Sequence, residues 1–435
     1  MSLTLNQDFT FSGKSLNITK EKNKLLEPYN KQIWNYGIVL ALIPTETQKE
    51  NLNQQIGNAR FVANQYLAKR KEIYNNEKRT LSVNEYSKNY LQNLKEEYPF
   101  LKLSDKFALA SAMEHIDTAY KNFFENLKKG RKAGFPKFVS RFKPNGNSYT
   151  TKFTNNNIEV LEIDGLPYVK IPKVGKIRFV MPKGYNLQMI QPEFTRILSA
   201  CIKHQRDSYT VSLQMETVID KIIPIQTVER SKIYSIDMGI KDFGIYGNSE
   251  FTEKVANPRF IKNNSKKLRR LQKSLNRKVF NSKKHCGSKN YRKAKLKIAE
   301  LHNRIKNQRK DFHHKLSRKI VNECDVFICE DLNIKGMVKN HKLAKEISSC
   351  GWGQFLTFVK YKLEKKGGIF LKVDKFFASS KLCSCCGYKK IDLTLKDRKW
   401  ECPICHTIHD RDVNAKMNLL KEGVRLLTLS NIAIA

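Results

Sequence analysis

The sequence lacks the features of membrane and secreted proteins. None of its apolar runs approaches the roughly 20 residues that a membrane-spanning helix needs. Residues 1–14 do not show the charged-then-apolar order of a signal peptide. The 10 cysteines include two close pairs, and the others are scattered, which fits a reducing compartment better than a disulfide framework. We therefore expect a soluble, cytoplasmic protein without a membrane partner.

Acidic residues are also scarce, with 41 Asp and Glu against 81 Lys and Arg, so the formal net charge is +40. An excess of this size requires a polyanionic partner. Nucleic acid is the expected one, because basic side chains that neutralise phosphates release counterions. A protein of membrane surfaces would instead show a basic amphipathic helix with a wide apolar face. The 435 residues, with a hydrophobic content of 40%, allow two or three domains.

Half of the charge excess lies between residues 261 and 320, where 22 Lys and Arg stand against two acids, Glu300 and Asp311. Apolar residues at helical spacing predict two helices there, joined by a loop over residues 281–290. A charge run is most often a solvated face, but this one has few acids for pairing and repels itself without a partner. The candidate nucleic-acid contacts are Lys266, Lys267, Arg269, Arg270, Arg277, Arg292, Lys293, Arg304, Arg309 and Lys310.

Two C-x2-C pairs, Cys383 with Cys386 and Cys402 with Cys405, are separated by fifteen residues. This is the spacing of a zinc ribbon, in which two such turns, or knuckles, close a tetrahedral thiolate site. The alternative is a set of reduced thiols in the core. Cys385 lies between the first two ligands, and we leave it unligated because only Cys383 with Cys386 keeps two residues between ligands.

Several carboxylates stand at the ends of predicted elements. Asp237 ends the first strand of a predicted hairpin, and Glu330 ends a buried strand over residues 325–332. Asp410 and Asp412 open a helix directly after the second knuckle. An Asp at a helix start also caps free N–H groups and favours the helix dipole, so this stretch alone does not separate capping from catalysis.

The element order around these acids is hairpin, helix, strand, helix, strand, helix, which matches the ribonuclease-H arrangement. In such a site two Mg²⁺ ions about 4 Å apart neutralise the charge that develops when a phosphodiester is hydrolysed. Carboxylate oxygens suit Mg²⁺, and thiolates do not. We therefore expect catalytic Mg²⁺ at the acids and structural Zn²⁺ at the cysteines.

In the other half of the chain, residues 1–35 are polar and without a period, which predicts a loosely ordered extension. A buried strand over residues 36–43 follows, and Thr45 with Gln48 forms a capping box for a helix. Helical patterns cover residues 46–73, 83–97 and 104–128, with their aromatic residues expected in the core. Alternating strands between residues 157 and 218 predict a small β-barrel or sandwich. The helical block is then an insertion into one β domain.

Six stretches in order carry a resemblance to a known family: GFPKF (134–138), IDMGI (236–240), NQRKDFHHK (307–315), CEDL (329–332), SSKLC (379–383) and DRDVNA (410–415). One alone would be weak, but their order is specific. From about residue 36 to residue 420 the chain resembles the transposon-encoded TnpB family, whose relatives are the compact type V CRISPR effectors.

The resemblance implies an α+β multidomain fold, with a β-barrel wedge domain, an inserted helical recognition domain and a RuvC-like, ribonuclease-H-like α/β nuclease domain carrying the zinc ribbon. The expected boundaries are 1–35 (extension), 36–45 and 130–230 (wedge), 46–129 (recognition), 231–380 and 407–435 (nuclease) and 381–406 (zinc ribbon). The catalytic acids it implies are Asp237, Glu330 and Asp412. Asp412 is preferred to Asp410 because the family's acid stands two residues before an Asn, here Asn414.

The implied activity is that of an RNA-guided DNA endonuclease, which binds a structured guide RNA, recognises a short motif beside its double-stranded DNA target and cuts. A monomer is favoured. A nuclease-inactive RNA-guided repressor and a conventional transposase are the alternatives.

Residues 1–35 have no family counterpart, and residues 39–43 lack an expected basic residue. His406 stands where the second knuckle usually has Gly, so its turn geometry is expected to differ.

Overall fold

The computed structural model describes residues 4–5, 11–12, 19–141, 146–190, 195–205, 208–281, 286–341, 343–394 and 397–435. The chain divides into two compact units, Met1–Lys221 and Ile222–Ala435, each described by itself below. In the described ranges, no helix combines the length and apolar character that crossing a bilayer requires. Parts of the predicted turn at residues 205–207 and of the predicted loop at 281–290 lie outside these ranges.

The first unit is built on one antiparallel sheet in the order β4-β8-β9-β3-β7-β6-β5. Its strands are β3 (Lys31–Ile43), β4 (Ser148–Lys152), β5 (Glu159–Ile163), β6 (Leu166–Ile171), β7 (Gly175–Val180), β8 (Thr195–Gln205) and β9 (Ser208–Asp220). The core lies between this sheet and a helix, where Leu40, Phe179 and Leu213 pack with Leu52 and Ile56. The short strands β1 (Thr4–Leu5) and β2 (Phe11–Ser12) form a separate pair, and α6 spans Leu187–Ile190.

Four helices between β3 and β4 form a second core in this unit, as the insertion pattern predicts. They are α2 (Glu46–Glu77), α3 (Val83–Asn89), α4 (Leu91–Glu97) and α5 (Lys106–Lys128). The capping box of α2 is confirmed, since Thr45 and Gln48 exchange hydrogen bonds of 3.0 and 3.3 Å. The single helix predicted over residues 83–97 is interrupted at Tyr90. Tyr66 and Tyr120 are buried, as expected for core aromatics.

The prediction of a loosely ordered extension was wrong for residues 19–35. Helix α1 (Thr19–Leu26) precedes β3, which begins at Lys31 rather than at residue 36. Lys22 is completely buried, and its Nζ donates to both carboxylate oxygens of Glu216 at 2.7 and 2.9 Å. Arg196 pairs with the same carboxylate at 2.9 Å. A tertiary ion pair with a strand almost 200 positions away orders this segment, and no local pattern reveals such a pair.

The second unit has a five-stranded sheet in the order β13-β12-β11-β16-β17. Its strands are β11 (Ile233–Met238), β12 (Asp242–Gly247), β13 (Thr252–Ala256), β16 (Val326–Glu330) and β17 (Ile369–Val373). Strands β11, β16 and β17 are parallel, whereas β12 and β13 are antiparallel additions. The predicted hairpin is confirmed, and β13 extends it by a strand that the sequence analysis did not predict.

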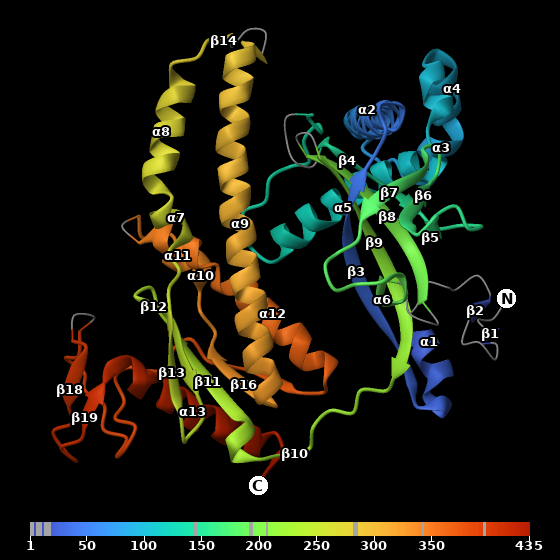
Figure 1. Cartoon of the computed structure of the whole chain (residues 1–435). Coiled ribbons are helices and arrows are strands. Elements are labelled where there is room, and N and C mark those ends of the chain that lie inside the picture. Colours follow the sequence, from blue (N-terminus) through green and yellow to red (C-terminus); the bar gives the residue numbers. More distant parts are fainter. Residues whose placement is uncertain are drawn as a thin grey trace. The chain divides into compact units, whose positions relative to one another are not determined.

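Helices cover both faces of this sheet, because alternate residues of a strand point to opposite sides. Phe327 and Cys329 of β16 pack with α9 (Lys289–Glu323) and α12 (Trp352–Lys365). Val326 and Ile328 pack on the other face with α13 (Arg411–Leu429). The helices predicted on either side of the basic loop are α8 (Ser265–Asn276) and α9, which form a long hairpin (Figure 1).

Shorter elements complete this unit. They are α7 (Phe260–Asn263), α10 (Ile334–Met337) and α11 (Ala344–Cys350), with three strand pairs: β14 (Phe280–Asn281) with β15 (Cys286–Gly287), β18 (Lys399–Glu401) with β19 (Ile408–Asp410), and β10 (Thr227–Val228) with β20 (Ala433–Ile434). The β18–β19 pair lies at the second knuckle and leads directly into α13.

Substituting Glu216 tests the buried ion pair. Glu216→Gln leaves the Lys22 ammonium buried without a counter-charge, which destabilises the surrounding fold by about 3 kcal/mol. Hydrogen–deuterium exchange of the α1 and β9 peptides measures this local loss. Asp220→Asn is the matched control, since its partner pair with Lys31 is exposed and such pairs contribute about 1 kcal/mol or less. Equal exchange in the two variants contradicts the assignment.

Candidate functional site

The four predicted zinc ligands converge. The sulfur atoms of Cys383, Cys386, Cys402 and Cys405 all lie within 4.8 Å of one another. Each knuckle is closed by a pair of backbone hydrogen bonds, and the N–H groups of Gly387 and His406 donate to the carbonyls of Cys383 and Cys402, each at 2.9 Å. Four cysteines leave no open position for a substrate, so the cluster has the composition of a structural zinc site.

The second knuckle keeps the geometry of the first despite its histidine. Gly387 has φ +80° in the first knuckle, and His406 has φ +56° at the equivalent position of the second. The expected difference in turn geometry is therefore absent. His406 accepts the left-handed conformation that a glycine adopts at little cost. Its ring also lies 3.1 Å from Glu401, which fixes the side chain on the outside of the turn.

Neighbouring groups favour the metal-binding thiolate form at Cys405, whereas burial raises the pKa of Cys383. The Thr407 hydroxyl lies 3.3 Å from the Cys405 sulfur and lowers the pKa of this thiol. The Nε2 atom of buried His409 lies 3.0 Å from the Cys383 sulfur, where its proton can support a ligating sulfur from the second coordination shell. Cys385 is exposed and outside the converging group.

The predicted acids lie at the carboxyl ends of neighbouring parallel strands. Ile236 of β11 pairs with Cys329 of β16, so the next residues, Asp237 and Glu330, lie side by side near the carboxyl ends of these strands. Asp412 is in the first turn of α13, which packs across the same strands.

Two contacts hold α13 against the sheet. The Ser235 hydroxyl on β11 donates to the Lys416 carbonyl at 2.8 Å. Gly423 lies so close to Ile328 on β16 that any side chain there would collide with it. The fold thus brings the start of α13 to the strand ends.

These three carboxylates interact electrostatically. Burial raises the pKa of Asp237 to about 7, and the carboxylates of Asp412 and Glu330 add to the shift. Burial also raises the pKa of Glu330. Like charges held near one another resist ionisation, and a hard divalent cation relieves that cost. The donor set therefore fits Mg²⁺ in chemistry and charge.

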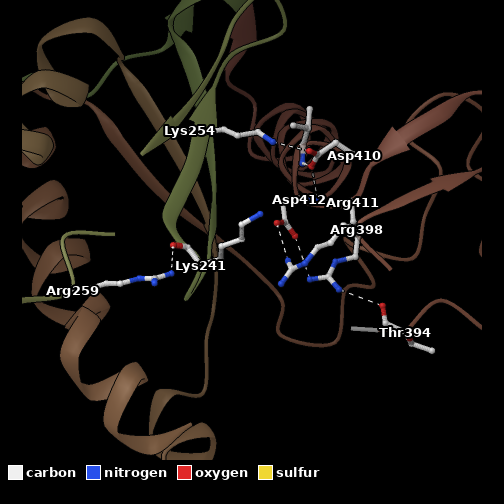
Figure 2. Close-up of polar contacts among 9 residues, drawn as sticks. Lys241, Lys254, Arg259, Thr394, Arg398, Asp410, Arg411 and Asp412 are labelled. Atoms are coloured by element: carbon white, nitrogen blue, oxygen red, sulfur yellow. Dashed lines mark hydrogen bonds and ion pairs between the residues drawn. The ribbon is translucent and has the colours of Figure 1, made fainter. Parts of the chain in front are cut away.

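The carboxylate oxygens do not converge as the cysteine sulfurs do. Among the described residues, the cysteines are the one group of His, Cys, Asp or Glu side chains gathered closely enough to hold an ion. Asp412 is instead paired with two arginines, Arg398 and Arg411, each at 3.2 Å (Figure 2).

The sequence analysis singled out neither arginine. Arg411 had a local signal, because it stands between the two aspartates. Arg398 lies between the knuckles and had none. It reaches Asp412 only because the ribbon folds back on the start of α13.

Asp410 takes the capping role that the sequence left open for these two aspartates. Asp410 is the N-cap of α13, and its carboxylate accepts from the N–H groups of Asp412 and Val413, each at 3.1 Å. Lys254 on β13 donates to it at 2.6 Å (Figure 2). Burial alone would raise the pKa of Asp410, but these hydrogen bonds outweigh it and lower the pKa. Asp410 therefore caps the helix, whereas the Asp412 carboxylate pairs with Arg398 and Arg411.

The predicted nucleic-acid contacts lie mainly on exposed surface. Helix α8 has no buried residue, and a groove of about 410 Å³ along it is lined by Lys266, Arg269, Arg270, Lys273, Ser274 and Arg277. Arg309 differs from the rest, since it is partly buried and donates to the carbonyls of Ser348 and Ser349 at 3.1 and 3.3 Å. Arg309 therefore holds the end of α11 in place.

Fold and site together define a mixed α/β, multidomain protein with a basic helical hairpin, a group of acids at strand ends and a Cys₄ cluster. Three family models match parts of the chain: "Probable transposase" over residues 200–341, "Cas12f1-like, TNB domain" over 352–419 and "Helix-turn-helix domain" over 34–79. The last range folds here as most of strand β3 followed by the single helix α2.

Curated relatives span nearly the whole chain. A Streptomyces pristinaespiralis protein is 31% identical over 385 residues, which cover 88% of this chain and 87% of that protein. The InsQ protein of Escherichia coli K12 is 25% identical over 405 residues, covering 89% and 92%. Both are named "Putative RNA-guided DNA endonuclease". This chain belongs to their family, the TnpB family.

A solved structure supports the fold. The Cas12f1 chain of a Cas12f1–sgRNA–target DNA complex matches 90% of this chain and 99% of its own length, with a TM-score of 0.50 and 15% identity. At that identity the match shows a shared mixed α/β architecture.

Removing one cysteine tests the metal centre. We expect Cys402→Ser to lower the zinc content of the purified protein from about one ion per chain to near zero, because a closed site needs all four ligands. Elemental mass spectrometry measures the content. Cys385→Ser is the matched control and should retain its zinc. Loss of zinc in the control, with retention in Cys402→Ser, would reassign the ligands.

Proposed function

We propose that this protein is an RNA-guided DNA endonuclease that hydrolyses phosphodiesters at Asp237, Glu330 and Asp412. One observation carries the proposal: buried Asp237 interacts electrostatically with Glu330, at the end of the neighbouring parallel strand, and with Asp412 at the start of α13. Membership of a family whose curated relatives are named for this activity supports it. The RuvC-like domain comprises residues 231–380 and 407–435, with the zinc ribbon at 381–406.

The chain's own residues prepare the site. Strand pairing fixes Asp237 beside Glu330, and the α13 contacts fix Asp412. Asp237 interacts with both other carboxylates, and the three together would hold Mg²⁺. Bound Mg²⁺ would neutralise charge on the attacking water, the phosphorus and the leaving oxygen. Arg398 and Arg411 form ion pairs with Asp412. Both arginines would have to release this carboxylate before it could bind a metal cation.

The other parts of the chain are proposed to bind the guide RNA and the target DNA. The wedge segments, 36–45 and 130–230, and the inserted helices, 46–129, bind the guide RNA and a short motif beside the target. The α8–α9 hairpin contacts phosphates, and base pairing between guide and target supplies the sequence choice. The charge of +40 suits a protein that holds two polyanions at once, and a monomer suffices for this.

One observation favours a second candidate function. Because Asp412 is paired with two arginines and the acids do not converge, an RNA-guided DNA-binding protein that does not cut is the alternative. The presence of all three acids argues against it. Target occupancy without strand scission in the presence of Mg²⁺ would establish it.

Two aspartates two positions apart provide a matched test of the acid assignment. Asp412→Asn removes a proposed metal ligand and should lower the DNA cleavage rate by about 100-fold or more, with guide-RNA binding unchanged. Asp410→Asn retains a good N-cap residue, so α13 and most of the activity should survive. Cleavage is measured on labelled duplex DNA with the RNA that copurifies with the protein, and RNA binding by filter retention.

Two outcomes would contradict this assignment. One is Mg²⁺-dependent cutting retained by Asp412→Asn, and the other is cutting lost in Asp410→Asn alone.

The groove along α8 gives a salt-dependence prediction. Replacing Arg270 with Gln should reduce the slope of log affinity against log salt by about 0.7–0.9, because each phosphate contact releases a counterion. Fluorescence anisotropy with the guide RNA at several salt concentrations measures the slope. Lys360→Gln on α12, whose Lys360 pairs with Glu364, is the control and should leave the slope unchanged. Equal slopes for Arg270→Gln and the native protein would contradict the prediction that α8 contacts the guide RNA.

A further inference from the structure

A pocket of about 300 Å³ lies in the second unit. Its walls come from the turn after β11, the segment between β13 and α7, the start of α8, and α11. Ile240 on the first wall is only three residues beyond Asp237. The turn that follows the strand of one proposed catalytic acid therefore builds one side of the pocket.

Specific hydrogen bonds hold the walls in place. The amide of Asn257 donates to the Ile240 carbonyl at 2.8 Å and accepts from the Arg259 N–H at 3.1 Å. The Arg259 guanidinium reaches the Lys241 carbonyl at 3.4 Å (Figure 2). On the opposite wall, Arg309 donates to the Ser349 carbonyl. The pocket is thus part of the folded structure around the site.

The lining is basic and partly apolar. Arg259, Lys262, Arg269 and Lys345 face a single carboxylate, Glu346. None of these four cations is in an ion pair with a carboxylate within the part of the chain that the structure describes. Such an excess at one small site favours an anionic ligand, because neighbouring like charges are costly until an anion joins them.

The apolar part of the lining narrows the ligand class. Ile240 and Ile261 offer surface to a flat, weakly polar group, which a simple phosphate ion lacks. A phosphate joined to a ring meets both requirements. The volume is at the lower end of sites that take one small molecule, about 300–1,000 Å³, so one nucleotide fits and a base pair does not.

The pocket also adjoins the basic groove on α8. Arg269 lines both of them. A single strand lying along α8 would therefore pass the pocket on its way to the acids. This adjacency favours a nucleotide within a strand over a free mononucleotide.

We propose that this pocket holds one nucleotide of the DNA strand presented to the carboxylate group, with its phosphate among the four cations and its base against Ile240 and Ile261. The proposal rests on the proposed nuclease function and names a binding position for its substrate. By fixing a nucleotide beside the strand end, the pocket sets which phosphate reaches the acids.

Filling the pocket tests the proposal without requiring cleavage. In full-length protein carrying Asp237→Asn, the probe is a fluorescent four-nucleotide single-stranded DNA at fixed salt. Ser349→Trp places an indole in the pocket and should weaken binding about tenfold, a change of 1.4 kcal/mol. Ser348→Trp, on the exposed neighbouring residue of α11, is the matched control and should change it less than about twofold.

A charge variant gives an independent measurement. Lys345→Gln should weaken binding of the same probe, and Lys360→Gln on α12 should not. Inorganic phosphate should compete weakly with the probe, and a four-base-pair duplex should bind more weakly than the single strand. Equal effects of the two tryptophan variants, or full competition by phosphate alone, would overturn the nucleotide pocket.

These binding results stand apart from the proposed function. If Asp412→Asn abolishes cutting while Ser349→Trp leaves probe binding unchanged, the nuclease assignment is supported and the nucleotide-binding pocket is rejected. If neither the native protein nor any variant cuts DNA but Ser349→Trp weakens binding of the probe, the nuclease assignment is rejected and the nucleotide site is supported.

Discussion

The structure depends on holding like charges together. Asp237, Glu330 and Asp412 come from two strands and a helix; burial raises the pKa of Asp237 to about 7, and the other two carboxylates add to the shift. Flexible segments would move such groups apart, so the acids are fixed on parallel strands and on a helix packed across them. The close approach at Gly423 and the bond from Ser235 keep α13 in place against that repulsion.

The two aspartates at the start of α13, Asp410 and Asp412, have different partners. Asp410 is engaged by the helix N–H groups and by Lys254, whereas Asp412 is paired with Arg398 and Arg411. The zinc ribbon contributes more than a stable loop, since it carries Arg398 to the Asp412 carboxylate. The ribbon and the acid group are thus coupled through one ion pair. Closing the Cys₄ cluster affects the charge of the site as well as the local fold.

Most elements and the metal-ligand cysteines were predictable because their signals are local. The capping box at Thr45, the buried strand at residues 326–330 and the two cysteine knuckles each depend on near neighbours in the sequence. Tertiary contacts escaped prediction. Lys22 orders α1 through a partner on β9, and Arg398 meets Asp412 only after the ribbon folds. The proximity of the three acids followed from element order, but their pairing with arginines did not.

The scarcity of acids elsewhere explains how a negatively charged site can receive a negatively charged strand. A phosphodiester near Asp237 is repelled by every carboxylate there, so the energy that brings it in must come from contacts made at a distance from the reacting phosphate. The segment from 261 to 320, with 22 basic and two acidic residues, supplies them, and Arg269 joins the α8 groove to the pocket. In the proposed function, cations along the path attract the strand, and the acids at its end would hold the divalent ions.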